Sequence, residues 1–80
     1  MHATITNMEL KFADNLKPDQ LMPEDLIMVE DEVVEVLAIA SDETGSVYAV
    51  AYKDEFGEKN IAQFQHDEFV SLYVYVDSDT

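Results

Sequence analysis

The sequence predicts a small, mainly β domain: a compact antiparallel barrel of about five strands with an additional N-terminal edge strand. Three observations lead to this fold class. Segments rich in valine and tyrosine alternate with period two, two turns have Asp in the first and Gly in the fourth position, and 80 residues allow one domain with a small core. We therefore expect an edge strand and connector over residues 1–20 and the barrel over residues 21–80.

The edge strand is expected where Met8, Leu10 and Phe12 alternate with polar or charged residues. Such alternation is typical of a strand with one apolar face. The segment ADNLKPDQ, residues 13–20, contains turn-forming residues. We interpret it as the connector to the barrel.

Residues 21–40 allow two interpretations. Their apolar residues recur at the 3,4 spacing of an amphipathic helix, and acidic residues lie off that stripe. Six of the apolar residues are β-branched, which lowers helix propensity and suits a pleated sheet. Together with the period-two segments that follow, this favours two strands, over 26–29 and 33–40. The second strand has apolar residues on both faces, as expected for a strand that bends from one sheet into another.

Two similar turns separate the later strands. Residues 42–45 read DETG and residues 54–57 read DEFG, which are the residue preferences of a type I turn. The polar residues QHDE before the last strand could form one turn of 3₁₀ helix. Short strands joined by tight turns predict a barrel, whose closure would also protect the strand edges. The three later strands are expected at 47–52, 58–64 and 69–76.

Charge is the strongest feature of the composition. Eighteen acidic residues face four lysines and no arginine, which gives a formal net charge of -14. Direct binding to DNA, RNA or an anionic membrane is disfavoured, because it requires cationic side chains. A basic protein, including a DNA-binding protein, is the favoured partner, with association steered by the electric field. The alternative is that the charge serves solubility alone.

The compartment is constrained by absences in the sequence. The chain has no cysteine, so it offers neither a disulfide nor a thiolate metal site. The N-terminal segment lacks the pattern of a signal peptide, and no window approaches the roughly 18 apolar residues of a membrane-spanning helix. We expect a soluble, cytoplasmic protein without a cofactor, and the oligomeric state stays open.

Two segments resemble known families. LMPEDLIMV resembles the opening of SH3-like barrels of the KOW and elongation-factor type, with Glu24 where glycine is usual, and VYAVAYKDEFGEKN resembles a Tudor domain. The resemblance covers about residues 21–76 and implies an SH3-like barrel that binds partners without catalysis. Tudor domains hold methylated lysine or arginine in an aromatic cage. The resemblance implies Tyr48, Tyr52 and Phe56 as the candidate cage residues, because they match the later part of the Tudor pattern. The first loop is acidic where that family has an aromatic residue, and the basic residues of RNA-binding KOW domains are missing.

Signatures of catalysis and of metal binding are weak. His2 and His66 have no partnered nucleophile in the sequence, so we expect no enzyme activity. Asp54, Glu55 and Glu58 lie around one turn and could hold a calcium ion loosely. A solvated turn explains the same residues better, because the spacing of a calcium loop does not occur.

The tyrosines suggest a binding surface. Tyr48 and Tyr52 share one strand face, as do Tyr73 and Tyr75. If these faces met outside the core, they would form an aromatic platform, beside the acidic residues of the turn at 54–58, for a cationic side chain. The competing interpretation is that the tyrosines pack at the barrel rim with their hydroxyls in water. The predicted binding residues are Tyr48, Tyr52, Asp54, Glu55, Phe56, Glu58, Tyr73 and Tyr75.

The leading functional hypothesis is a non-enzymatic acidic module that binds a basic protein surface or segment. One alternative is a DNA mimic that inhibits a DNA-binding protein, a strategy of small phage and mobile-element proteins. Successive turns of an up-and-down barrel alternate between its ends, so the acidic residues would not follow one stripe as DNA phosphates do. A further alternative is a small structural subunit of a larger, viral assembly.

Overall fold

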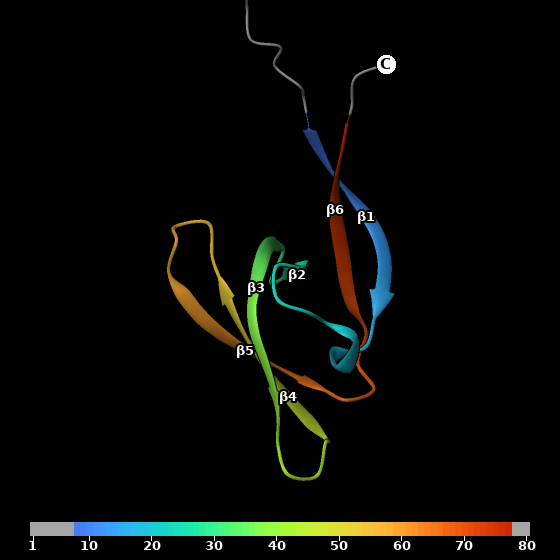
Figure 1. Ribbon diagram of the computed structural model, residues 1–80, viewed down its shortest axis with the longest axis vertical. Coiled ribbons are helices and arrows are strands. Elements are labelled where there is room, and N and C mark those ends of the chain that lie inside the picture. The colour runs from blue at the N-terminus through green and yellow to red at the C-terminus, as the bar shows by residue number, and fades with distance from the viewer. Residues whose placement is uncertain (1–7, 78–80) are drawn as a thin grey trace, which may run out of the picture.

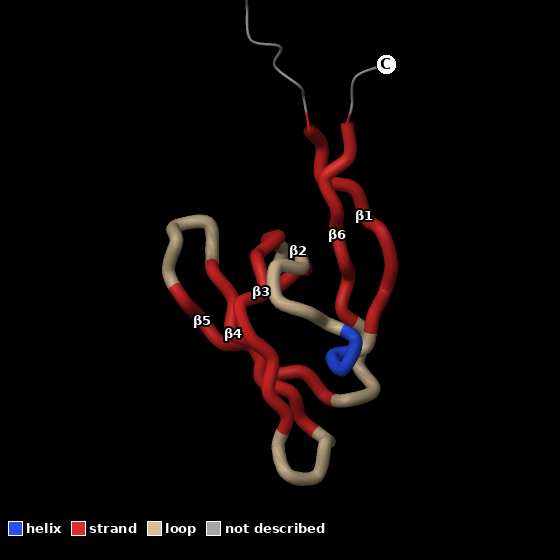
Figure 2. Tube along the Cα trace, viewed as in Figure 1, coloured by secondary structure: helices blue, strands red, loops and turns tan. Residues whose placement is uncertain are grey.

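The computed structural model describes residues 8–77, which fold into one sheet of six antiparallel strands with almost no helix (Figures 1 and 2). His2 lies outside these residues. The mainly β prediction is confirmed. No helix of the described range is long and apolar enough to cross a membrane. The elements are β1 (Met8–Leu16), the 3₁₀ helix η1 (Pro18–Gln20), β2 (Leu26–Val29), β3 (Glu32–Ser41), β4 (Val47–Lys53), β5 (Lys59–Gln65) and β6 (Val70–Asp77).

The sheet is open. Its strand order is β1-β6-β2-β3-β4-β5, so β1 and β5 form the two edges. Strands β2 to β5 form an antiparallel meander, and β6 returns to lie between β1 and β2. The sheet curls, as Figure 1 shows, but its edge strands do not pair with each other. The predicted closed barrel is therefore not formed.

The interpretation of residues 21–40 as strands is confirmed, and all five later strands agree with their expected ranges within one residue. The connector prediction for residues 13–20 is wrong in part, because β1 continues through a bulge between Phe12 and Asp14 as far as Leu16. The 3₁₀ helix also forms elsewhere than expected, at η1. Residues 65–68 instead form a turn closed by the Glu68 N–H, which donates to the Gln65 carbonyl at 3.0 Å.

The core lies on the concave face of the curled sheet. Alternate residues of the central strands point into it, as period two requires. A register shift between Val36 and Ala38 lies within β3 and does not interrupt the sheet. The prediction that this strand passes into a second sheet is therefore wrong. The buried apolar residues are Leu21, Ile27, Val29, Val34, Val36, Val50, Tyr52 and Val70.

Both glycine turns have the predicted form. The Gly45 N–H donates to the Asp42 carbonyl at 3.2 Å, and the Gly57 N–H donates to the Asp54 carbonyl at 3.0 Å. Both glycines have positive φ, 73° and 80°, which glycine adopts without steric cost. The turn signals in the sequence thus place both hairpins correctly.

The hairpin between β2 and β3 has an unusual sequence. Its two central residues, Glu30 and Asp31, have φ of 50° and 67°. Two positive φ values in a two-residue loop are typical of a type I′ turn, which normally prefers Asn-Gly. Here two acidic residues adopt this conformation between the paired residues Val29 and Glu32.

Candidate functional site

Two acidic turns meet at one end of the sheet. The Glu55 N–H in the β4–β5 turn donates to Glu32 Oε2 at 3.0 Å, which joins this turn to the start of β3. Glu30 and Asp31 lie in the adjacent β2–β3 turn. This end of the molecule therefore contains the acidic residues of the β2–β3 and β4–β5 turns.

A groove of about 340 Å³ opens between the β2–β3 turn and β5. This volume is at the small end of the range for ligand sites, which suits one side chain better than a cofactor. One of its lining residues is acidic and none is basic. We call it the groove, and its lining residues are Met28, Val29, Glu30, Tyr52, Ile61, Ala62, Gln63 and Phe64.

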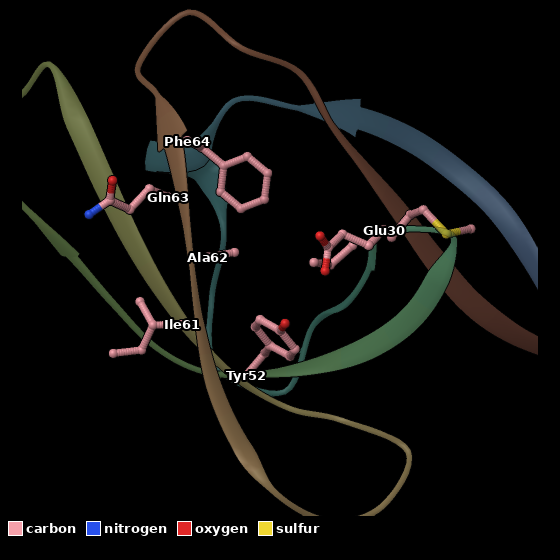
Figure 3. Close-up of a pocket in the computed structure, with 8 residues that line it drawn as sticks. Glu30, Tyr52, Ile61, Ala62, Gln63 and Phe64 are labelled. Atoms are coloured by element: carbon pink, nitrogen blue, oxygen red, sulfur yellow. The ribbon is translucent and has the colours of Figure 1, made fainter.

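Three side chains give the groove its chemistry. Figure 3 shows that the carboxylate of Glu30 and the rings of Tyr52 and Phe64 extend toward one open space. The side chains of Ile61 and Gln63 lie on the other side of β5 in the same view, as alternation along a strand requires. A carboxylate opposite two aromatic rings is an arrangement that attracts a cation.

The predicted tyrosine platform is not formed. Tyr52 is only 9% exposed and belongs to the core, with its ring forming a wall of the groove. Tyr48 lies on the same inward face of β4. Tyr73 and Tyr75 lie on the opposite face of the sheet, because Tyr73 pairs with Leu26 while the adjacent Leu72 pairs with the buried Ile27.

The predicted residues of the β4–β5 turn have different positions. Phe56 is 80% exposed at the tip of the turn, away from the lining of the groove. Asp54 holds the turn together, because its Oδ1 accepts the Phe56 and Glu58 N–H groups at 2.9 Å and its Oδ2 accepts the Asn60 side-chain amide at 2.9 Å. Glu55 and Glu58 are exposed beside it. A binding role for these residues stays a prediction.

Sequence reasoning missed Glu30 and Phe64. Glu30 was noted only as part of an acidic loop, and its left-handed backbone has no signal in a Glu-Asp dipeptide. Phe64 had a usable signal, since EKNIAQF places Ala62 and Phe64 on one strand face. The register that pairs Phe64 with Tyr48 and Asn60 with Tyr52 brings this face beside the tyrosines of β4.

The other end of the sheet is also acidic. There the His66 N–H donates to the Ser46 carbonyl at 2.8 Å, so the turn at residues 65–68 lies against the β3–β4 turn. Asp42 Oδ1 accepts the Thr44 hydroxyl and the Ser46 and Val47 N–H groups. These bonds, the one from Thr44 most of all, lower the pKa of Asp42 below its ordinary 3.8. The acidic turns thus alternate between two ends, which weighs against a DNA-like stripe.

Across residues 8–77 no three His, Asp or Glu side chains are grouped so that they could share a metal ion. Asp54, Glu55 and Glu58 are included in that range.

Comparison with protein-family models, with curated proteins and with solved structures finds no match.

Proposed function

We propose that the protein is a non-enzymatic, acidic interaction module whose groove takes a lysine or arginine side chain from a basic segment of a partner protein. The observation behind this proposal is the carboxylate of Glu30 opposite the rings of Tyr52 and Phe64, in a groove without a basic residue. The site differs from the tyrosine platform expected from the sequence. The class of ligand, a cationic side chain, is the same.

The energetics of such a site are favourable but modest. A cation over an aromatic face gains about 0.5–2 kcal/mol, depending on how far it is desolvated. An exposed ion pair with Glu30 adds up to about 1 kcal/mol. The partner would therefore bind with several basic residues, of which one enters the groove and the others face Glu55, Glu58 and the neighbouring acidic turn.

The backbone of Glu30 supports a functional role for its side chain. A left-handed backbone at a residue other than glycine or asparagine costs free energy, and such strain is concentrated at functional sites. Asparagine or glycine at this position would stabilise the turn. The glutamate at this position is explained if its carboxylate is needed in the groove.

We further propose that the open sheet is a variant of the SH3-like barrel. The meander of β2 to β5, with β6 returning beside β2, supports this interpretation, as does the resemblance of residues 21–76. In this interpretation the groove lies where closure would bring β5 toward the β2–β3 hairpin. A cytoplasmic location, where free lysine-rich segments of other proteins are accessible, belongs to the same proposal.

The proposal is tested by the affinity for a fluorescently labelled oligolysine peptide, measured by anisotropy. Glu30→Gln should weaken binding roughly fivefold, which corresponds to about 1 kcal/mol. Glu43→Gln changes the net charge equally at the opposite end of the sheet and serves as the matched control. Its affinity should stay close to that of the wild type.

Equal losses in the two variants would contradict the proposal. That result would mean that the peptide responds to net charge and not to the groove. The oligolysine affinity should also fall as salt is added, since the acidic turns contribute by screened attraction. The urea-unfolding curve of each variant shows whether the fold is retained.

A further inference from the structure

Strand β1 is an edge with an unpartnered apolar face. Within residues 8–77, the pairing of β2 with β6 covers Tyr73 and Leu72. Residues 8–12 and 73–77 therefore form a two-stranded ribbon, and its part beyond Tyr73 projects from the body of the sheet (Figure 1). A two-stranded ribbon alone is marginally stable in water.

One face of this ribbon is mainly apolar and open to solvent, with Asp77 beside Met8 at its end. Phe12 packs edge-on against Tyr73, with ring centroids 6.0 Å apart, and is still 53% exposed. Met8 and Leu10 lie on the same face at period two, and Tyr75 beside Leu10 is 57% exposed. An exposed apolar strip next to an unpaired strand edge favours association with another strand.

We infer that β1 pairs antiparallel with β1 of a second copy of this chain, with the two-fold axis at Leu10. This dimer is independent of the groove, which lies between the β2–β3 turn and β5. In this register Met8 lies opposite Phe12 of the second copy and Leu10 opposite its own equivalent. The same register places Glu9 opposite Lys11 of the second copy, and Lys11 opposite its Glu9.

Charge complementarity selects this register over its neighbours. Opposite charges across a strand pair stabilise it, and like charges destabilise it. An axis at Lys11 would oppose two lysines, and an axis at Glu9 would oppose two glutamates. An axis between residues would put charged side chains opposite apolar ones. Only the axis at Leu10 matches apolar with apolar residues and Glu with Lys.

The bulge after Phe12 limits the contact to the ribbon. The register shift between Phe12 and Asp14 interrupts the regular strand, so a partner strand would pair with residues 8–12. The resulting sheet would have four strands in the region where one copy has two, which removes the weakness of the isolated ribbon. The other edge, β5, has Lys59 as its only charged residue and offers no such complementary pairing.

The dimer is tested by sedimentation equilibrium at increasing protein concentration. The two copies both have a negative net charge and repel each other. The buffer therefore contains at least about 0.15 M salt, at which repulsion between exposed charges is largely screened beyond about 8 Å. We expect the wild type to form dimers. The Lys11→Glu variant should stay monomeric, because its dimer would contain two pairs of opposed glutamates. The double variant Glu9→Lys/Lys11→Glu restores the opposed charges and should dimerise again. A monomeric wild type, or a Lys11→Glu variant that dimerises like the wild type, overturns the inference.

Cross-linking tests the register directly, because the chain has no cysteine of its own. Opposed residues in an antiparallel pair have Cα atoms about 5 Å apart, within the range of a disulfide. Leu10→Cys should therefore oxidise to a covalent dimer. Phe12→Cys should not, since its two copies would be about 14 Å apart in this register. Preferential cross-linking of Phe12→Cys would overturn the proposed axis.

Discussion

At the residue scale, the backbone of three acidic residues is the least expected feature of the structure. Glu24, Glu30 and Asp31 have φ of 77°, 50° and 67°. For an L-residue this region brings Cβ close to the following carbonyl oxygen and costs roughly 1–2 kcal/mol. Glu24 follows Pro23 in a turn closed by the Asp25 N–H, which donates to the Met22 carbonyl at 3.1 Å. Such a turn prefers glycine after proline, because the residue in that position needs a positive φ.

Glu24→Gly should therefore stabilise the protein by about 1 kcal/mol, because it removes the steric cost while keeping the turn. The measurement is the free energy of unfolding from urea denaturation. Glu43→Gly is the matched control, since Glu43 lies in an exposed turn and has no positive φ. That variant should be neutral or less stable. A loss of stability in Glu24→Gly would show that the side chain contributes more than its backbone conformation costs.

The groove could be predicted only in part from the sequence. Period two placed Tyr48 and Tyr52 on one face, which the structure confirms. It could not show that this face is the inner one, because both faces of β4 contain only valine, alanine and tyrosine before Lys53. Glu30 has no local signal, since its position in the groove depends on a turn conformation that glutamate disfavours.

At the element scale, the two Asp-x-x-Gly turns organise the hairpins by the same means. In each turn the first Asp accepts N–H groups of the residues that follow, as Asp42 does from Ser46 and Asp54 does from Phe56. At Asp42 these bonds favour the charged carboxylate, which links the stability of the β3–β4 hairpin to pH.

The pKa of Asp42 is the clearest consequence. It lies below the ordinary 3.8, and the Thr44 hydroxyl is the largest cause. A carboxyl whose pKa is lowered on folding stabilises the fold above its unfolded pKa. This contribution is lost as the pH falls from 3.8 through the folded pKa.

The chemical shift of the Asp42 side-chain carboxyl carbon, measured by NMR, should follow this titration below pH 3.8. Thr44→Val removes the hydroxyl and should move the pKa of Asp42 up toward 3.8. A wild-type pKa at or above 3.8, or one unchanged by Thr44→Val, would contradict the role given to this hydrogen bond. Urea unfolding of Asp42→Ala and the wild type should differ at neutral pH and converge as the pH falls below 3.8.

The strands could be predicted well because their signals are local, while closure could not. Alternation and turn residues are visible over short windows, so the five later strands were placed within one residue. Whether β5 meets another strand depends on the curl of the whole sheet and on the bulges at Phe12/Asp14 and Val36/Ala38. The connector prediction failed in part for the same reason: β1 continues past its bulge because β6 pairs with it as far as Leu16.

At the scale of the whole molecule, two surfaces have separate chemistry. The groove lies at the end where the β2–β3 and β4–β5 turns meet, and it is acidic and aromatic. The ribbon of β1 and β6 is apolar on one face and contains one Glu–Lys pair, with 3.9 Å between Lys11 Nζ and Glu9 Oε2. Under the proposed function, the net charge of -14 attracts a basic partner to either end. Selectivity for one site therefore has to come from the groove itself.

The most direct test of this account is a map of the amide NMR shifts caused by an oligolysine peptide. We predict that the shifts are largest at residues 28–30, 52 and 61–64, where the groove is lined. The β3–β4 turn at residues 42–46 is equally exposed to long-range attraction but does not line the groove, and its amides should move little. Shifts of similar size in both regions would contradict the account, because the peptide would then respond to charge alone.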